Sequence, residues 1–73
     1  MNLLLAKQVD GRWSRVGCFR ARQDGTPTNH GERIGGTMEA VALRQGAHTI
    51  ASDKAIVDVD LEFYGHKYRV TRY

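Results

Sequence analysis

The sequence predicts an α+β fold in the order β-β-α-β-β, with a mostly antiparallel four-stranded sheet and one helix packed on one face of it. Three features predict it: a turn signal at Asp10-Gly11, a helical apolar stripe after Thr37, and alternation of apolar and acidic residues from Val57 to Phe63. The chain, 1–73, is expected to be a single domain. Its expected parts are a hairpin, a connector, a helix and a second hairpin, at residues 2–22, 23–36, 37–53 and 55–73.

The first hairpin is predicted by Asp10-Gly11, which is among the strongest signals for a two-residue turn. Such a loop gives three cross-strand pairs on one face: Val9 with Arg12, Leu5 with Val16, and Leu3 with Cys18. The other face is apolar as well, and carries Leu4, Ala6, Trp13, Gly17 and Phe19. A three-residue loop, which would shift the register by one residue, and a bulge at Gly17 are the alternatives.

The connector, residues 23–36, is rich in glycine and contains the only proline of the chain. A loop of this length in a compact domain is either mobile or functional. Its last part, Gly31 to Thr37 (GERIGGT), runs into a helix N-terminus, a geometry that can hold phosphate. Because it lacks the lysine and the spacing of a P-loop, a flexible lead-in to an N-cap is the favoured interpretation.

The helix at 37–53 is predicted to begin with Thr37 as its N-cap, and Glu39 in the first turn suits the helix dipole. An apolar stripe runs along one side of it, formed by Ala40, Leu43, Ala47 and Ile50, with Ala51 beside it. Gly46 costs about 1 kcal/mol against alanine inside a helix. A stripe of small residues lets a helix lie close to a sheet, which is a structural reason for Gly46 and Ala47.

The second hairpin is predicted with Gly65-His66 as a two-residue loop. That register gives four cross-strand pairs: Phe63 with Tyr68, Glu62 with Arg69, Leu61 with Val70, and Asp60 with Thr71. Apolar pairs then share one face, and an acid–base pair lies on the other. Most of the charge in this segment is therefore interpreted as structural.

The positive charge is concentrated at the N-terminal end of the chain. The net charge is +3, and residues 1–24 hold five basic and two acidic side chains, so the whole excess lies there. Residues 25–56 and 57–73 each hold three of either sign. A surface of this sign favours nucleic acid or an acidic protein as the partner.

No enzyme, metal or cofactor is expected. The only cysteine, Cys18, excludes an intramolecular disulfide, and neither it nor the three histidines (His30, His48 and His66) has metal-ligand spacing. An enzyme would require a site assembled across a dimer. Leu3-Leu4-Leu5 is too short for a signal segment or a membrane span, so a cytoplasmic protein that is complete from Met1 and makes no membrane contact is expected.

The candidate binding residues combine arginines with aromatic side chains, which suit phosphate contacts and base stacking or a protein interface. They are Arg12, Trp13, Arg15, Phe19, Arg20 and Arg22. In the simple register Arg15 shares a face with Trp13 and Phe19, whereas Arg20 and Arg22 lie on the other face. Since one helix covers only one sheet face, Leu4, Trp13 and Phe19 are expected to be covered by a second copy, giving a homodimer, or by a macromolecular target.

The element order, with a helix from Thr37 to Asp53 between two hairpins and no catalytic residues, resembles that of small anti-CRISPR inhibitors among the proteins of phages and mobile elements. The resemblance implies stoichiometric docking on a CRISPR effector complex, and it assigns no site residues. The predicted function is a small basic non-enzymatic binding protein that docks on a nucleoprotein complex or nucleic acid. The alternative is a self-associating structural or regulatory subunit without nucleic-acid affinity.

Overall fold

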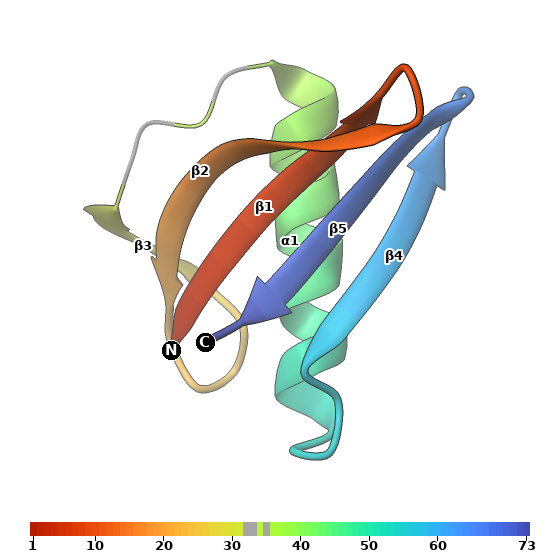
Figure 1. The fold of residues 1–73 in the computed structure, drawn as a ribbon. Helices are drawn as coiled ribbons and strands as arrows, with labels where there is room; N and C mark the ends of the chain where they lie inside the picture. Colours follow the sequence, from red (N-terminus) through yellow and green to blue (C-terminus); the bar gives the residue numbers. More distant parts are fainter. Residues whose placement is uncertain (32–33, 35) are drawn as a thin grey trace.

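In the computed structural model, a five-stranded antiparallel sheet curls over a single helix (Figure 1). The structure describes residues 1–31, 34 and 36–73. The elements are β1 (Asn2–Val9), β2 (Arg12–Ala21), β3 (Pro27–Gly31), α1 (Thr37–Ser52), β4 (Asp58–Phe63) and β5 (His66–Arg72). The strands lie in the order β3-β2-β1-β5-β4, so the two chain-terminal strands β1 and β5 are neighbours at the centre.

The α+β class, the single helix and the antiparallel sheet are confirmed, but four strands and the order β-β-α-β-β are wrong. A further strand, β3, lies in the segment interpreted as a connector and pairs with β2 at the edge of the sheet. Sequence patterns did not indicate it because Pro27 lacks a backbone N–H and the segment has no apolar alternation. Pro27 is the first residue of an edge strand, where its missing N–H costs no ladder hydrogen bond.

The β1–β2 hairpin is confirmed, but its register differs from the simple one. Asp10 and Gly11 form the two-residue loop, with φ of 51° and 77°, and Val9 pairs with Arg12 as predicted. Between Leu5 and Ala6 the register shifts, because β2 contains one extra residue there, Val16.

The bulge reverses the faces of the residues that follow it in β2. Leu5 pairs with Gly17 and Leu3 with Phe19, so the predicted pairs of Leu5 with Val16 and Leu3 with Cys18 are wrong. Phe19 is consequently turned toward the helix.

The β4–β5 hairpin is also confirmed, with Tyr64-Gly65 rather than Gly65-His66 as its loop. Phe63 therefore pairs with His66 instead of Tyr68, and the acid–base pair is Asp60 with Arg69. This shift of two residues leaves every side chain on its predicted face, because faces alternate with a period of two. Val57, in contrast, lies outside β4 and is 54% exposed.

The N-cap of the helix lies one residue earlier than predicted. Gly36 is the N-cap in place of Thr37, and the backbone N–H of Gly36 donates to the Glu39 carboxylate at 3.1 Å. Gly46 packs directly against β5, since a Cβ added there would lie 2.7 Å from Cβ of Val70. The predicted reason for a small residue at Gly46, close approach of the helix to the sheet, is confirmed.

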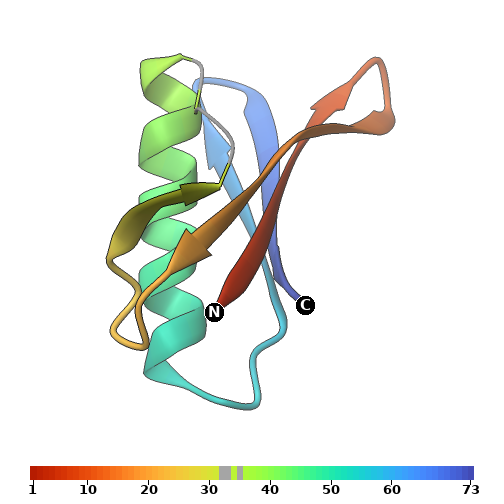
Figure 2. The same ribbon diagram turned by 90° about the vertical axis from the view of Figure 1, so that its left-hand side faces the viewer.

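The core fills the space between α1 and one face of the sheet. It consists of Leu3, Leu5, Phe19, Ala21, Ala42, Leu43, Ala47, Ile50, Tyr68 and Val70. In the described part of the chain no element covers the opposite sheet face, which we call the open face. Figure 2 shows α1 on one side of the sheet, with the β1–β2 turn extending away from it.

Candidate nucleic-acid interface

The open face is polarised from acidic to basic. Its side chains form rows across β4, β5, β1 and β2, because the cross-strand partners are in register. One row reads Asp60, Arg69, Ala6 and Arg15, and the next reads Asp58, Thr71, Leu4 and Cys18. The β4 margin is therefore acidic, β5 carries Arg69 and Thr71, β1 contributes the apolar Leu4 and Ala6, and the β2 margin carries guanidinium groups.

Trp13 lies on this face opposite Gln8 and is 38% exposed. The Arg69 guanidinium carbon lies 4.3 Å from the Trp13 ring centroid, a cation–π contact. Arg69 is held in turn by Asp60, since its Nε donates to Oδ1 at 2.6 Å and its Nη2 to Oδ2 at 3.0 Å. These bonds lower the pKa of Asp60 and raise the pKa of Arg69. Arg69 therefore positions the indole, and its charge is largely balanced.

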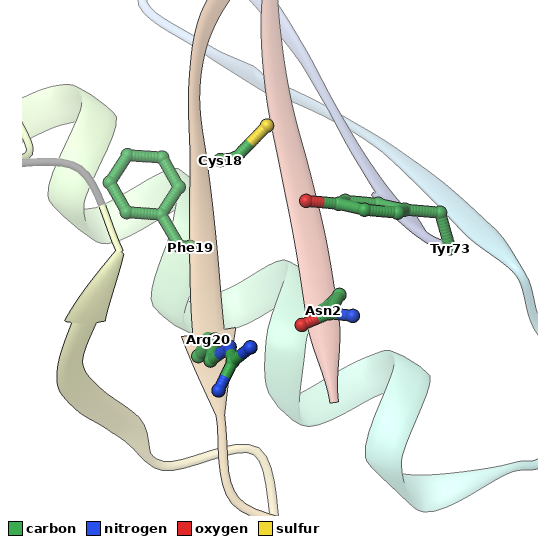
Figure 3. A pocket seen from close by; sticks show the side chains of 5 residues that line it. All are labelled: Asn2, Cys18, Phe19, Arg20 and Tyr73. Carbon is green, nitrogen blue, oxygen red and sulfur yellow. The ribbon is translucent and has the colours of Figure 1, made fainter.

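A second aromatic side chain, Tyr73, lies at the other end of the open face. In Figure 3 its ring lies beside β1, with the hydroxyl group at the strand on the side of Cys18. Hydrogen bonding with Cys18 is the main cause that raises the pKa of Tyr73, followed by desolvation. Arg15 Nη2 donates to Cys18 Sγ at 3.6 Å. An open hollow of about 200 Å³ lies here and is lined by Asn2, Cys18, Phe19, Arg20 and Tyr73.

The structure brings together three of the six predicted binding residues. Trp13, Arg15 and Arg20 share the open face, because the bulge moves Arg20 to the side of Trp13 instead of the opposite side. Arg12, the partner of Val9, lies on the other face of the hairpin tip, and Arg22 is exposed in the turn after β2.

The expectation that Phe19 is uncovered is wrong. Phe19 is 6% exposed and belongs to the core. Figure 3 shows its ring on the opposite side of β2 from the Cys18 thiol. The physical reason is again the extra residue in β2.

Sequence reasoning missed Arg69 and Tyr73 as members of this surface. The predicted register places Arg69 in a structural pair with Glu62, and it assigns no role to Tyr73. The period-two alternation of β5 was the available signal, since it places Arg69, Thr71 and Tyr73 on one face.

Among the other candidate side chains, His48 has a local structural role. Nδ1 of His48 lies 3.2 Å from the Asp24 carbonyl oxygen, which ties the helix to the β2–β3 turn. Among the described residues, no three histidine, cysteine or acidic side chains are grouped to hold a metal ion. The phosphate-binding alternative for Gly31 to Thr37 includes residues 32, 33 and 35, which lie outside the described residues.

Comparisons with known proteins give no match: no family model, no curated protein and no solved structure resembles this chain. In the described part of the chain, no helix is both long enough and apolar enough to cross a membrane. Function is therefore inferred from the side chains of the open face.

Proposed function

We infer that the chain is a small, basic, non-enzymatic binding protein that uses its open face to dock on nucleic acid, either free or within a nucleoprotein complex. The observation that carries this proposal is the gathering of Trp13, Arg15 and Arg20 on the one sheet face that no described element covers. Guanidinium groups contact phosphates, and an exposed indole stacks on a base.

Single-stranded nucleic acid fits this surface better than a duplex. Bases must be unstacked to lie on aromatic side chains, and Trp13 and Tyr73 offer two such surfaces at opposite ends of the face. Arg15 and Arg20 lie along β2 between and beside them, where a sugar–phosphate backbone would pass. Arg69 holds the Trp13 ring in place but adds little net positive charge, because Asp60 pairs with it.

The test uses Trp13 as its own reporter, since it is the only tryptophan. A single-stranded oligonucleotide should quench its fluorescence, and the affinity should fall with salt by about 0.7 log units per log unit for each phosphate contacted. Arg15→Gln combined with Arg20→Gln should lower that slope by about 1 to 2. The control is the double variant Arg12→Gln with Arg22→Gln, which removes the same amount of charge away from the open face. It should change the slope less. Absence of quenching at low salt, or equal losses in both double variants, would contradict the proposal.

A nucleoprotein target is the form of this function that the resemblance to anti-CRISPR inhibitors suggests. A CRISPR effector incubated with an equimolar amount of the protein should then lose binding of its target DNA. The loss should be reversed by Trp13→Ala combined with Arg15→Gln. If every effector type tested bound its target DNA unaltered, the anti-CRISPR function would be excluded. Free nucleic acid would then remain as the proposed target.

Self-association is the second candidate, and the apolar residues of β1 on the open face favour it. Leu4 and Ala6 are only half-buried there, so a second copy could cover them. Sedimentation velocity over a wide concentration range would then show a dimer, and Leu4→Lys would dissociate it. A stable dimer that binds no oligonucleotide would favour self-association over the nucleic-acid proposal.

A further inference from the structure

The outer edge of β4 forms a second docking surface, which is separate from the basic margin of the open face. We propose that it accepts an extended polypeptide segment of alternating basic and apolar residues, added to the sheet as a further strand. Three features of β4 carry this inference: the direction of its backbone groups, the charge on one side of the edge, and an apolar groove on the other.

The backbone of β4 presents free pairing positions outward. Among the described residues β4 pairs only with β5, and it is the last strand of the sheet. The N–H of Arg72 donates to the carbonyl of Val57 at 2.8 Å, which fixes the alternation of the ladder. Every second residue from Val57 to Phe63 therefore bonds toward β5. The N–H and C=O groups of the residues between them, Asp58, Asp60 and Glu62, point to the outer edge.

The side chains of these same three residues lie on the open-face side and are exposed. Asp60 is paired with Arg69 and Glu62 lies opposite Lys67, whereas Asp58 lies opposite the uncharged Thr71. Basic residues of an added strand would lie directly across from this acidic row. The row also argues against a second copy pairing through its own β4, because like charges would then face each other.

The helix side of the edge supplies the complementary apolar surface. A groove of about 330 Å³ lies between the start of α1 and the hairpin tip, lined by Thr37, Met38, Val41, Phe63 and Tyr64. Alternate side chains of an added strand point to this side, so its apolar residues can enter the groove.

Tyr64 gives this groove an exposed aromatic wall at a conformational cost. Its φ is 50°, a left-handed conformation that an aromatic residue rarely adopts, and it is 93% exposed. Asp10-Gly11 closes the other hairpin with the same geometry and residues that suit it. An exposed aromatic residue in a strained turn is typical of an interface anchor.

The probe is a short capped peptide of alternating lysine and valine, with an isomer that groups the lysines and the valines as its control. Saturating alternating peptide should slow hydrogen exchange of the Asp58, Asp60 and Glu62 amides about tenfold or more. The side-chain signals of Met38 and Val41 should shift together with them. Unchanged exchange at these amides, or an equal effect of the grouped isomer, would overturn the proposal.

Variants separate backbone pairing from charge. Glu62→Pro removes an outward N–H while leaving the Leu61 and Phe63 bonds to β5, and should weaken peptide binding about tenfold or more. Glu62→Gln keeps the N–H and should weaken it about threefold. Asp10→Asn removes the same charge at the other hairpin and should have no effect. Equal losses of peptide affinity in Glu62→Pro and Glu62→Gln would show that only the charge of Glu62 matters, which would contradict strand addition.

Two further measurements keep the test decisive if Glu62→Pro does not fold. A peptide N-methylated on alternate residues cannot pair with the edge and should not bind the unaltered protein. Val41→Lys should block the groove, whereas Gln45→Lys, one turn along the same helix, should not. Binding of the methylated peptide, or equal binding by the two lysine variants, would overturn the proposal. Arg15→Gln with Arg20→Gln should leave peptide binding unchanged, so failure of the nucleic-acid proposal is recognised separately.

Discussion

The β1–β2 and β4–β5 hairpins close with the same turn geometry but differ in the regularity of their strand pairing. Asp10-Gly11 has φ of 51° and 77°, and Tyr64-Gly65 has φ of 50° and 80°. From that common start β4–β5 is regular throughout, whereas β1–β2 contains the bulge at Val16. Alternation therefore predicts the faces of β4 and β5 correctly even with the wrong partners. In β2 one extra residue moves Phe19 to the core face and Arg20 to the open face.

The hairpins also differ in how firmly the helix holds them. Tyr68 and Val70 of β5 are buried against α1, and Gly46 leaves room for Val70. The tip of β1–β2 extends beyond the helix in Figure 2, where Val9 is 49% exposed and Trp13 38%. Both hairpins contribute core residues, but only the tip of the first extends beyond the helix, and that tip carries Trp13 of the proposed binding surface.

The largest expected effect comes from deleting one residue in each hairpin. Deleting Asp60 from the regular β4 forces one end of the strand to reverse its faces, and should cost about 4 kcal/mol or more, enough to unfold a domain of this size. Deleting Val16 merely removes the bulge and keeps every other pair of β1 with β2. It should cost about 1 to 2 kcal/mol for one half-buried valine.

Urea unfolding of the two deletion variants measures this difference. Equal destabilisation by the two deletions would contradict the account of the bulge. A folded protein lacking Val16 in which Trp13 has left Arg69 would contradict it as well.

The next effect concerns the contact of the helix with the second hairpin. Gly46→Ala should destabilise the protein by about 2 kcal/mol, because the new Cβ collides with Val70, although alanine favours a helix by about 1 kcal/mol. Val9→Ala, at the tip of the first hairpin, should change stability by about 0.5 kcal/mol or less. Thermal unfolding followed by circular dichroism compares them, and a stabilised Gly46→Ala protein would show that the helix does not lie this close to β5.

A smaller effect, of opposite sign, is expected from the turns. Tyr64→Asn should stabilise the protein by about 1 kcal/mol, because asparagine tolerates the left-handed conformation. Asp10→Asn replaces one favourable turn residue with another and should be neutral within about 0.5 kcal/mol. Chemical denaturation of both variants gives the comparison, and a loss of stability in Tyr64→Asn would show that the ring contributes packing that its exposure does not indicate.

The smallest effect is the titration of Asp60. Because its folded-state pKa is lowered by Arg69, the ion pair stabilises the protein above the ordinary aspartate pKa of about 3.9 and is lost as the pH falls through the folded-state value. The gain is small because both side chains are more than a third exposed. Trp13 fluorescence should change in this acidic range as Arg69 is released. Asp60→Asn should not show the step, and an identical step in that variant would contradict the assignment.

The parts of the fold that follow from local patterns could be predicted from the sequence. The helix, both hairpin turns to within a residue and the close approach at Gly46 depend on neighbours along the chain. The edge strand β3 and the bulge at Val16 depend on what β2 meets in space, which no local pattern contains. The site was half predicted for the same reason: Trp13 and Arg15 precede the bulge, whereas Arg20 and Phe19 follow it.

The central claim is that the bulge assembles Trp13, Arg15 and Arg20 into one binding surface on the open face. Amide chemical shifts of the ¹⁵N-labelled protein, titrated with a single-stranded oligonucleotide at low salt, test it most directly. The account predicts that the largest shifts fall on the Trp13 indole and on the amides of Arg15, Cys18 and Arg20, with α1 unaffected. Shifts centred on α1, or none at saturating oligonucleotide, would contradict it.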